Sequence, residues 1–306
     1  MKTTWTPSRL RLGADLALLA VTAIWGSTFV LVKGAVARYP VFPFLMVRFA
    51  VAALVLAPLA WLSRRAIRPH DVPAGILAGV LLFAGYALQT FGLQETEAAK
   101  AGFITGLSVV LVPLFVAILW RQWPTWWALL GILLATLGLA LLSLNADWSI
   151  RRGDLLVLGC AVGFAAHITA LGVLSPGRDP RFLTLVQVAT VAVLSGLFTS
   201  LQGPFPPMPT PVIEAALFTG VAATALAFFV QTAAQRFTTA SHTALIFTAE
   251  PVFAALFGVL ATGERLAVRG WLGCSVILVG VTLGALTQAS APGAPKDRLL
   301  GMARDG

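Results

Sequence analysis

Uncharged, apolar stretches of about twenty or more residues recur along the whole chain and constrain its fold more than any other feature. They cover residues 72–94, 101–120, 122–146, 155–177, 182–213, 215–235 and 270–295. A helix needs about 20 apolar residues to cross the ~30 Å hydrocarbon core of a bilayer. Only 11% of the 306 residues are charged, whereas soluble domains carry about 25%. The sequence therefore predicts an all-α polytopic membrane protein in contact with the lipid bilayer.

Other classes of protein fit the sequence less well. No segment of about ten residues alternates between polar and apolar residues, as the strands of a membrane β-barrel do. The net charge of +9 comes largely from arginines in short loops, where they orient helices. No basic stripe is interleaved with aromatic residues as nucleic-acid binding requires. Both cysteines fall in apolar spans and no metal-ligand spacing occurs. We expect no metal, no cofactor and no nucleic-acid partner.

Proline, glycine and charged residues divide the chain into ten predicted transmembrane helices. They lie near residues 15–33, 42–62, 73–93, 98–120, 125–144, 153–173, 181–201, 212–234, 239–262 and 269–288. The connections are short, so no separate soluble domain is expected. The tail at 289–306 is predicted to be flexible. A cleaved signal peptide is the alternative for the first span, but the repeat described next requires that span as a helix.

The two halves of the chain are related by one constant shift in residue number, the one that carries Gln89 onto Gln231. We call it the repeat shift. It matches Gln89 with Gln231, Thr90 with Thr232, Gly131 with Gly273, and Gly138 with Gly280. The match predicts one five-helix repeat at 12–146 and a second at 150–288. Because five is an odd number, the second repeat enters the membrane from the opposite side, as in the inverted repeats of many secondary transporters.

The distribution of positive charge predicts the orientation of the chain. If the N-terminus is cytoplasmic, 13 Lys and Arg residues lie in cytoplasmic segments and 7 lie in external segments. Positive residues favour the cytoplasmic side. We therefore expect both the N and C termini to be cytoplasmic.

Three strings carry a resemblance to a known family. Trp25-Gly26-Ser27-Thr28-Phe29 lies in the first span, AAKAGFITGLSVVLVP (98–113) in the fourth, and Glu250-Pro251-Val252-Phe253-Ala254 in the ninth, before Gly263-Glu264-Arg265. Together with the two repeats, they resemble the EamA branch of the drug/metabolite transporter superfamily over residues 12–288. The resemblance implies an exporter of small metabolites in the bacterial inner (plasma) membrane. The nearest comparison is with bacterial aromatic and neutral amino-acid exporters.

One departure from the family pattern concerns the Gly-Glu-Arg string. The first half has Arg121-Gln122-Trp123 at the corresponding place. An acid that only one half retains is better explained as a helix-end anchor, and we assign that role to Glu264.

Polar residues inside the spans are the candidates for substrate binding, because a charge facing lipid costs ~2.5–3.5 kcal/mol. Arg48 could bind a substrate carboxylate or extend to the outer interface. Tyr86, Gln89 and Thr90 share one helix face, and Phe228 and Gln231 repeat the pattern in the second half. These side chains could cushion and hydrogen-bond a substrate, or bond between helices.

Two histidines and the motif of the first helix complete the binding candidates. His167 falls at the repeat position of Trp25 and could contact substrate, carry a proton or serve as a bonded interior histidine. His242 is predicted to lie at the membrane interface. The motif residues Trp25, Ser27 and Thr28 are further candidates for substrate binding.

Glu250 is the only carboxylate deep within a predicted span. It could gain and lose a proton and so couple transport, or it could be a structural acid beside Pro251. Pro113 and Pro251 are predicted to bend the fourth and ninth helices. Relative to the repeat, the two prolines lie about one helical turn apart. We expect the two bent helices to gate the substrate pocket.

Together these features predict a secondary transporter that exports small metabolites, above all amino acids, by alternating access through a central cavity between the repeats. Drugs or other metabolites on the same fold are the alternative cargo. No catalytic motif and no Walker A loop are present, so neither an enzyme nor an ATP-driven pump is expected. We expect a small-molecule substrate and a monomer or weak homo-oligomer.

Overall fold

The computed structural model describes residues 7–62, 68–96, 98–143, 151–262 and 266–289, which form helices and no strand. The helices are α1 (Pro7–Val36), α2 (Val41–Trp61), α3 (Asp71–Glu95), α4 (Ala98–Gly106), α5 (Ser108–Trp120), α6 (Trp126–Ser143), α7 (Arg152–Leu174), α8 (Pro180–Gln202), α9 (Thr210–Phe218), α10 (Ala227–Ala234), α11 (Ala240–Phe247), α12 (Glu250–Thr262) and α13 (Val268–Ala289). A π-helix, η2 (Thr219–Leu226), joins α9 to α10. The Gly263-Glu264-Arg265 string and the tail beyond residue 289 lie outside the described residues.

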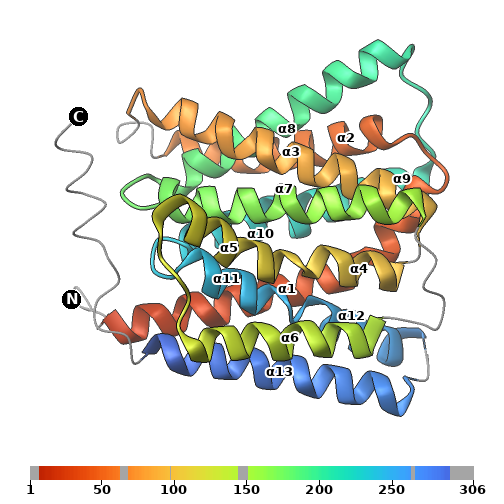
Figure 1. Cartoon of the computed structure of the whole chain (residues 1–306). Coiled ribbons are helices and arrows are strands. Elements are labelled where there is room, and N and C mark those ends of the chain that lie inside the picture. The colour runs from red at the N-terminus through yellow and green to blue at the C-terminus, as the bar shows by residue number, and fades with distance from the viewer. Residues whose placement is uncertain (1–6, 63–67, 97, 144–150, 263–265, 290–306) are drawn as a thin grey trace.

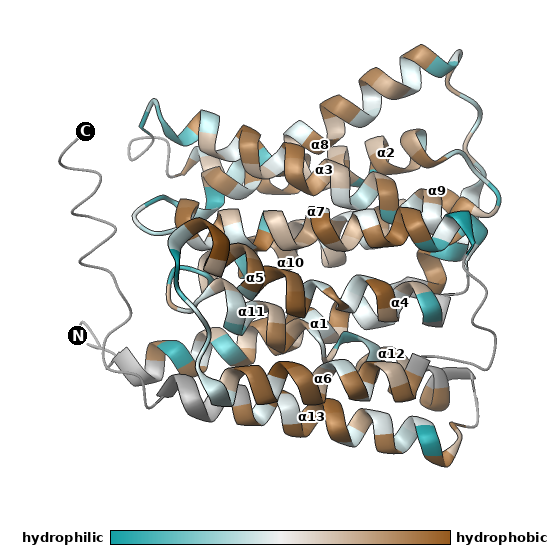
Figure 2. Cartoon of the chain, viewed as in Figure 1, coloured by the Kyte–Doolittle hydropathy of each residue, from teal (hydrophilic) through white to brown (hydrophobic). Residues whose placement is uncertain are grey.

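The helices have the surface of a membrane protein. Eight helical stretches of the described chain are long and apolar enough to cross a membrane, and Trp126–Leu142 and Val268–Leu283 are apolar but shorter. Hydrophobic residues follow the helices along most of their length (Figure 2). Large apolar side chains such as Leu54 and Ile118 are exposed, whereas the polar side chain of Gln187 is buried. Such an apolar surface is suited to contact with the lipid of a membrane.

Two predicted spans contain an interruption in their middle. α4 ends and α5 begins around Leu107, and α11 and α12 are separated by Thr248 and Ala249. At both places the backbone tightens: Leu107 N donates to the Ile104 carbonyl over 3.1 Å, and Ala249 N donates to the Ile246 carbonyl over 3.0 Å. The repeat shift carries the first of these bonds onto the second.

The two interruptions do not both coincide with the prolines. α5 continues through Pro113, so the interruption in this helix precedes the proline and lies between Gly106 and Ser108. Pro251 is the second residue of α12, where a missing N–H leaves no helical hydrogen bond unmade. The interruptions therefore occupy equivalent positions in the two halves, although the two prolines lie about one turn apart relative to the repeat.

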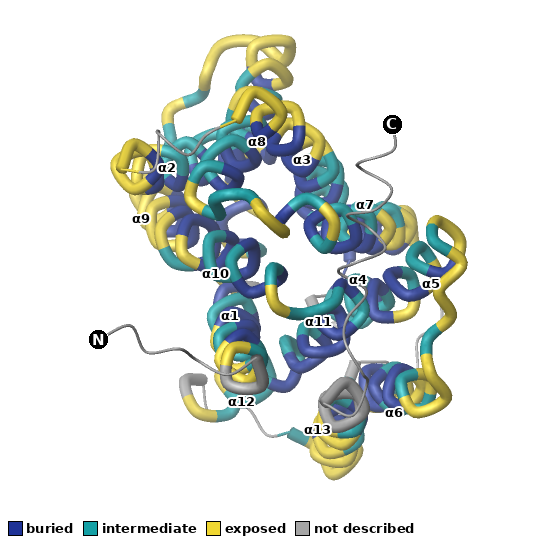
Figure 3. The backbone as a smooth tube through the Cα atoms, turned by 90° about the vertical axis from the view of Figure 1, so that its left-hand side faces the viewer, coloured by how far each residue is buried: buried dark blue, intermediate teal, exposed yellow. Residues whose placement is uncertain are grey.

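The third predicted span of each half packs against the first two spans of the other half. α3 packs against α7 and α8, whereas η2 and α10 pack against α1, α2 and α8. α2 pairs with α8 toward one edge of the bundle, and α6 pairs with α13 at the opposite edge (Figures 1 and 3). α1 begins and α13 ends at the same end of the molecule (Figure 1).

Glycines bring the backbones of α6 and α13 into direct contact. A Cβ on Gly138 would lie 2.7 Å from the Gly273 carbonyl oxygen, and a Cβ on Gly280 would lie 2.7 Å from the Gly131 carbonyl oxygen. Larger residues would force the helices apart. These are the four glycines that the repeat shift matched, and they form two equivalent crossings.

Candidate functional site

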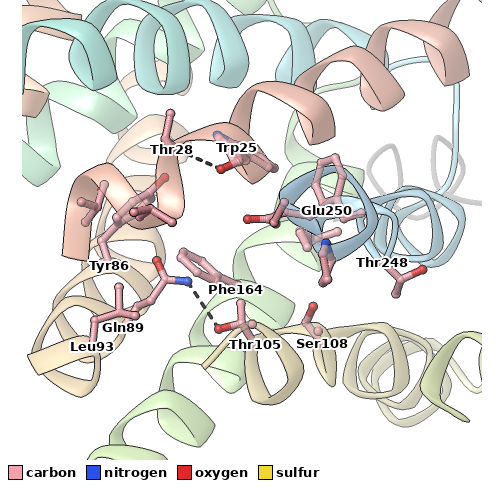
Figure 4. Close-up of a pocket in the computed structure, with 18 of the residues that line it drawn as sticks. Trp25, Thr28, Tyr86, Gln89, Leu93, Thr105, Ser108, Phe164, Thr248 and Glu250 are labelled. Atoms are coloured by element: carbon pink, nitrogen blue, oxygen red, sulfur yellow. Dashed lines mark hydrogen bonds between the residues drawn. The ribbon is translucent and has the colours of Figure 1, made fainter. Parts of the chain in front are cut away.

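A cavity of about 400 Å³ lies among α1, α2, α3, α7, α10 and the two interrupted helices. Its volume is within the range of small-molecule sites. Among the candidates chosen from sequence, those that line it are Trp25, Thr28, Arg48, Tyr86, Gln89, His167, Phe228, Gln231, Glu250 and Pro251. Figure 4 shows several of these side chains directed toward one space from helices far apart in the sequence.

Three other candidates do not line this cavity. The Ser27 hydroxyl donates to the Ile24 carbonyl over 2.7 Å, and the Thr90 hydroxyl donates to the Tyr86 carbonyl over 2.6 Å. Both therefore satisfy their hydrogen bonds within their own helices. Pro113 lies within α5 and outside the lining.

Arg48 is buried in the bundle, with 3% of its surface exposed, so extension to the outer interface is wrong. Its Nε donates to Thr224 Oγ1 over 2.8 Å, and its Nη2 donates to the Tyr86 hydroxyl over 3.3 Å. The guanidinium also lies 4.8 Å from the centre of the Tyr86 ring, within range of a cation–π interaction. Within the described part of the chain it forms no ion pair with a carboxylate.

The π-helix η2 supplies partners for two cavity residues. Its wider turns alter the backbone hydrogen bonding of an ordinary helix, and the Ala223 carbonyl accepts a bond of 2.8 Å from Trp25 Nε1. The adjacent Thr224 accepts the bond from Arg48. The predicted span over 212–234 contained no sign of this segment, because apolar composition does not distinguish a π-helix from an α-helix.

Glu250 begins α12 immediately after the interruption, and its side chain projects into the cavity (Figure 4). The described residues offer its carboxylate neither an ion pair nor a side-chain hydrogen bond. Its backbone carbonyl packs on Gly26, where an added Cβ would lie only 2.7 Å away. The glycine of the Trp-Gly-Ser-Thr-Phe motif therefore lets α1 cross α12 at the acid.

Aromatic rings form much of the cavity wall. Trp25 packs edge-on against Phe247, with ring centres 4.9 Å apart, and lies 5.4 Å from Phe228. Tyr86 contacts Phe164 at 5.3 Å. Such rings provide a large apolar surface with specific edge-to-face geometry, suited to a hydrophobic or aromatic side chain.

The polar residues of the repeated pattern have different partners in the two halves. Gln89 Nε2 lies 3.4 Å from Thr105 Oγ1 at the cavity, while Gln231 Nε2 donates to Gln235 Oε1 over 3.1 Å. His167 Nε2 lies 2.8 Å from Gln187 Oε1, and Gln187 donates in turn to Thr232. His167 therefore belongs to a buried hydrogen-bonded chain at the edge of the cavity.

The cavity also contains residues that sequence reasoning did not select, including Thr105, Ser108, Phe164, Phe247 and Thr248. A signal existed for one of them, because the repeat shift places Ser108 on Glu250. The other residues are common types in apolar spans, and only the helix rotations bring them to the cavity.

A many-helix membrane bundle around a partly polar cavity defines a membrane transporter as the class of protein. The chain belongs to the EamA-like transporter family, a branch of the drug/metabolite transporter superfamily, because the family model matches residues 12–144 and 151–285.

Individual relatives agree with the family assignment. An uncharacterized transporter of Archaeoglobus fulgidus is 35% identical over 276 residues, which are 90% of this chain and 87% of the relative. The uncharacterized transporter YoaV of Bacillus subtilis is 23% identical, over 89% of this chain and 96% of its own length. A solved crystal structure has a TM-score of 0.75 and 19% identity, covering 90% of this chain and 98% of its own. This last comparison shows the shared fold alone.

Proposed function

We propose that the protein exports zwitterionic amino acids, in particular those with apolar or aromatic side chains, from the cytoplasm across the plasma membrane. In this proposal ten transmembrane helices form two inverted repeats, 12–146 and 150–288, with both termini cytoplasmic. The reciprocal packing of α3 with α7 and α8, and of η2 and α10 with α1 and α2, supports the inverted arrangement. The cavity between the repeats opens alternately to the two sides.

The observation that carries the proposal is that one basic and one acidic side chain line the same cavity, and neither forms an ion pair with a described residue. Arg48 forms hydrogen bonds only to neutral groups among the described residues, and Glu250 has no cationic partner there. A buried charge without a counter-charge costs several kcal/mol. The carboxylate and ammonium groups of an amino acid supply both counter-charges, and the aromatic wall accepts its side chain.

Glu250 also offers a means of coupling. A carboxylate that holds either a proton or a substrate ammonium group exchanges one for the other, so the two move in opposite directions. Such exchange makes the protein a proton antiporter.

Counterflow in proteoliposomes tests the proposed substrate. Each labelled amino acid is offered to vesicles loaded with the unlabelled compound, alongside its amide, which lacks the carboxylate, and its N-acetyl form, which lacks the ammonium group. We expect exchange of the free amino acid and none of either derivative. Exchange of no amino acid contradicts the proposal. Efficient exchange of the amide removes the role of Arg48 and favours drugs or other cations as cargo.

Arg48→Gln and Arg48→Lys separate charge from geometry. We expect Arg48→Gln to lower exchange by about tenfold to a hundredfold, since a hydrogen bond to a charged group contributes about 1.5–3 kcal/mol. Arg48→Lys retains the charge but loses the planar fork, so an intermediate loss is expected. Unchanged exchange in both variants contradicts substrate binding by Arg48.

A further inference from the structure

Two polar pairs lie at opposite ends of the bundle. Lys100 Nζ lies 2.6 Å from Asp154 Oδ2, and His242 Nε2 lies 3.1 Å from Asp15 Oδ1. His242 lies in the first turn of α11 and has only 3% of its surface exposed, so its side chain packs inward against Asp15. We call Lys100–Asp154 and His242–Asp15 the clamp pairs.

The clamp pairs are related by the repeat. The repeat shift carries Lys100 onto His242. The repeat position of Asp154 is Leu12, and Asp15 follows it by slightly less than one helical turn. Sequence comparison alone hid this relation, because lysine and histidine differ and the acids are out of register.

Each clamp pair joins an interrupted helix to the first helix of the opposite repeat. Lys100 lies in α4 and Asp154 in α7, while His242 lies in α11 and Asp15 in α1. Packing reinforces both connections, since α7 contacts α4 and α5, and α1 contacts α11 and α12. Each interrupted helix therefore packs on its neighbour and places a basic side chain beside an acid there.

A different contact distinguishes the two ends of the bundle. At the end where α1 begins, α7 and α11 meet so closely that a Cβ on Gly172 would lie 3.1 Å from the Ala240 Cβ. The repeat position of Gly172 is Val30 in α1. Val30 has 76% of its surface exposed and lines the cavity. Gly172 is therefore packed at one end of the bundle, whereas the equivalent residue, Val30, is exposed at the other.

The cavity lining agrees with this difference. Val30 from the last two turns of α1, and Leu93 and Leu142 from the last turns of α3 and α6, all line the cavity. These helix ends lie opposite the end where α1 begins (Figure 1). The cavity thus extends toward the end at which α1 finishes, and the Gly172–Ala240 contact lies toward the closed end.

We propose that the clamp pairs stay formed throughout transport, while the Gly172–Ala240 contact is the gate that separates. In this mechanism α4 and α5 move with α7, and α11 and α12 move with α1, as two bodies that rock against each other. Opening at Gly172–Ala240 is accompanied by closure between α1 and α4 near Val30. The inference rests on the proposed alternating access and adds which contacts break and which persist.

Cross-linking distinguishes the gate from the clamp. In a background with Cys160→Ala and Cys274→Ala, the gate variant carries Gly172→Cys and Ala240→Cys, which are close enough for a disulfide after a small adjustment. The clamp variant carries Lys100→Cys and Asp154→Cys, joined by a reversible bifunctional thiosulfonate spacer that replaces the length of the lysine side chain. Both cross-links are removed by dithiothreitol, so each protein is its own control for correct folding.

The first measurement does not depend on the identity of the substrate. Ser108→Cys, which lies in the cavity lining, reports accessibility to a membrane-impermeant maleimide applied to either side of oriented proteoliposomes. With the gate cross-linked, we expect labelling of the cysteine at position 108 from one side only, and after reduction from both sides, read on the peptide that carries position 108 because the freed gate thiols also react. With the clamp cross-linked, we expect labelling from both sides. Two-sided labelling with the gate cross-linked overturns the gate assignment, and one-sided labelling with the clamp cross-linked overturns the clamp.

Amino-acid counterflow provides the second measurement. The gate cross-link should lower exchange by about tenfold or more, because closure becomes permanent, and reduction should restore it. The clamp cross-link should leave exchange within about twofold of the uncross-linked background protein. Proteins that show the expected labelling but exchange no amino acid contradict the proposed substrate and leave the gate and clamp intact.

Discussion

The two interrupted helices have the same backbone and different chemistry. In α4–α5 and in α11–α12, equivalent residues make the same backbone hydrogen bond across three residues. It runs from Leu107 to Ile104 in one half and from Ala249 to Ile246 in the other. The segment after the interruption begins with Ser108 in one half and with Glu250 in the other, and both residues line the cavity. The repeat thus preserves the shape of the helices but places the carboxylate in one half only.

This difference separates two roles that the sequence places side by side at Glu250 and Pro251. Proline is not required for the interruption, since α4 ends beside Gly106 while Pro113 lies well within α5. Glycine has a low helix propensity, which makes Gly106 a suitable point of interruption. The interruptions therefore belong to the architecture of both halves, and Glu250 belongs to the chemistry of the site.

The largest expected effect comes from removing the acid that distinguishes the halves. Glu250→Gln should lower amino-acid exchange by about tenfold to a hundredfold, since a hydrogen bond to a charged group contributes about 1.5–3 kcal/mol. It should also abolish dependence on a proton gradient. Counterflow with and without the gradient checks both results, and exchange that keeps its rate and proton dependence contradicts the assignment.

Moving the acid sharpens the same test. Because Ser108 and Glu250 are equivalent and face one cavity, the double variant Ser108→Glu with Glu250→Ser should exchange better than Glu250→Ser alone. No recovery in the double variant means that the two positions do not present a carboxylate to the same substrate.

A smaller effect is expected from filling the helix crossing at the second interruption. Gly26→Ala would place a Cβ 2.7 Å from the Glu250 carbonyl oxygen and 2.9 Å from Ala254 N. Both are backbone atoms, so the helices must separate, at a cost of about 1–3 kcal/mol. Thermal unfolding in detergent should show a clear decrease in Tm.

Gly34→Ala is the matched control in the same helix, because no atom lies within 4 Å of the added Cβ. Alanine has the higher helix propensity, so Tm should stay constant or rise. A similar decrease in both variants means that the loss at Gly26 does not come from the α1–α12 crossing.

The smallest effects are expected from the prolines. Pro251→Ala should slow exchange by only about threefold and leave equilibrium substrate binding largely unchanged, because it permits α11 and α12 to join while every polar side chain of the cavity is kept. Pro113→Ala should have less effect on exchange, since α5 is already continuous there. A greater slowing by Pro113→Ala than by Pro251→Ala would reverse the roles assigned to the two positions.

The sequence located much of the membrane architecture and most of the cavity candidates. Lipid cannot hydrogen-bond to the backbone, so spanning helices need long apolar stretches that are visible in one dimension. Intramembrane polar residues such as Arg48 and Glu250 stand out for the same reason. The partners of these residues were not predictable, because Thr224 reaches Arg48 only through the packing of η2 against α2.

The sequence by itself determined that the chain is an apolar helical membrane protein and carried its family resemblance, because solvent and repeat impose patterns along the chain. Tertiary structure alone decided that the interruptions are equivalent, that His242 meets Asp15, and that Gly172 meets Ala240 while Val30 remains exposed. Those outcomes depend on helix rotation and on contacts between residues far apart in the sequence. A hydropathy pattern constrains both only weakly.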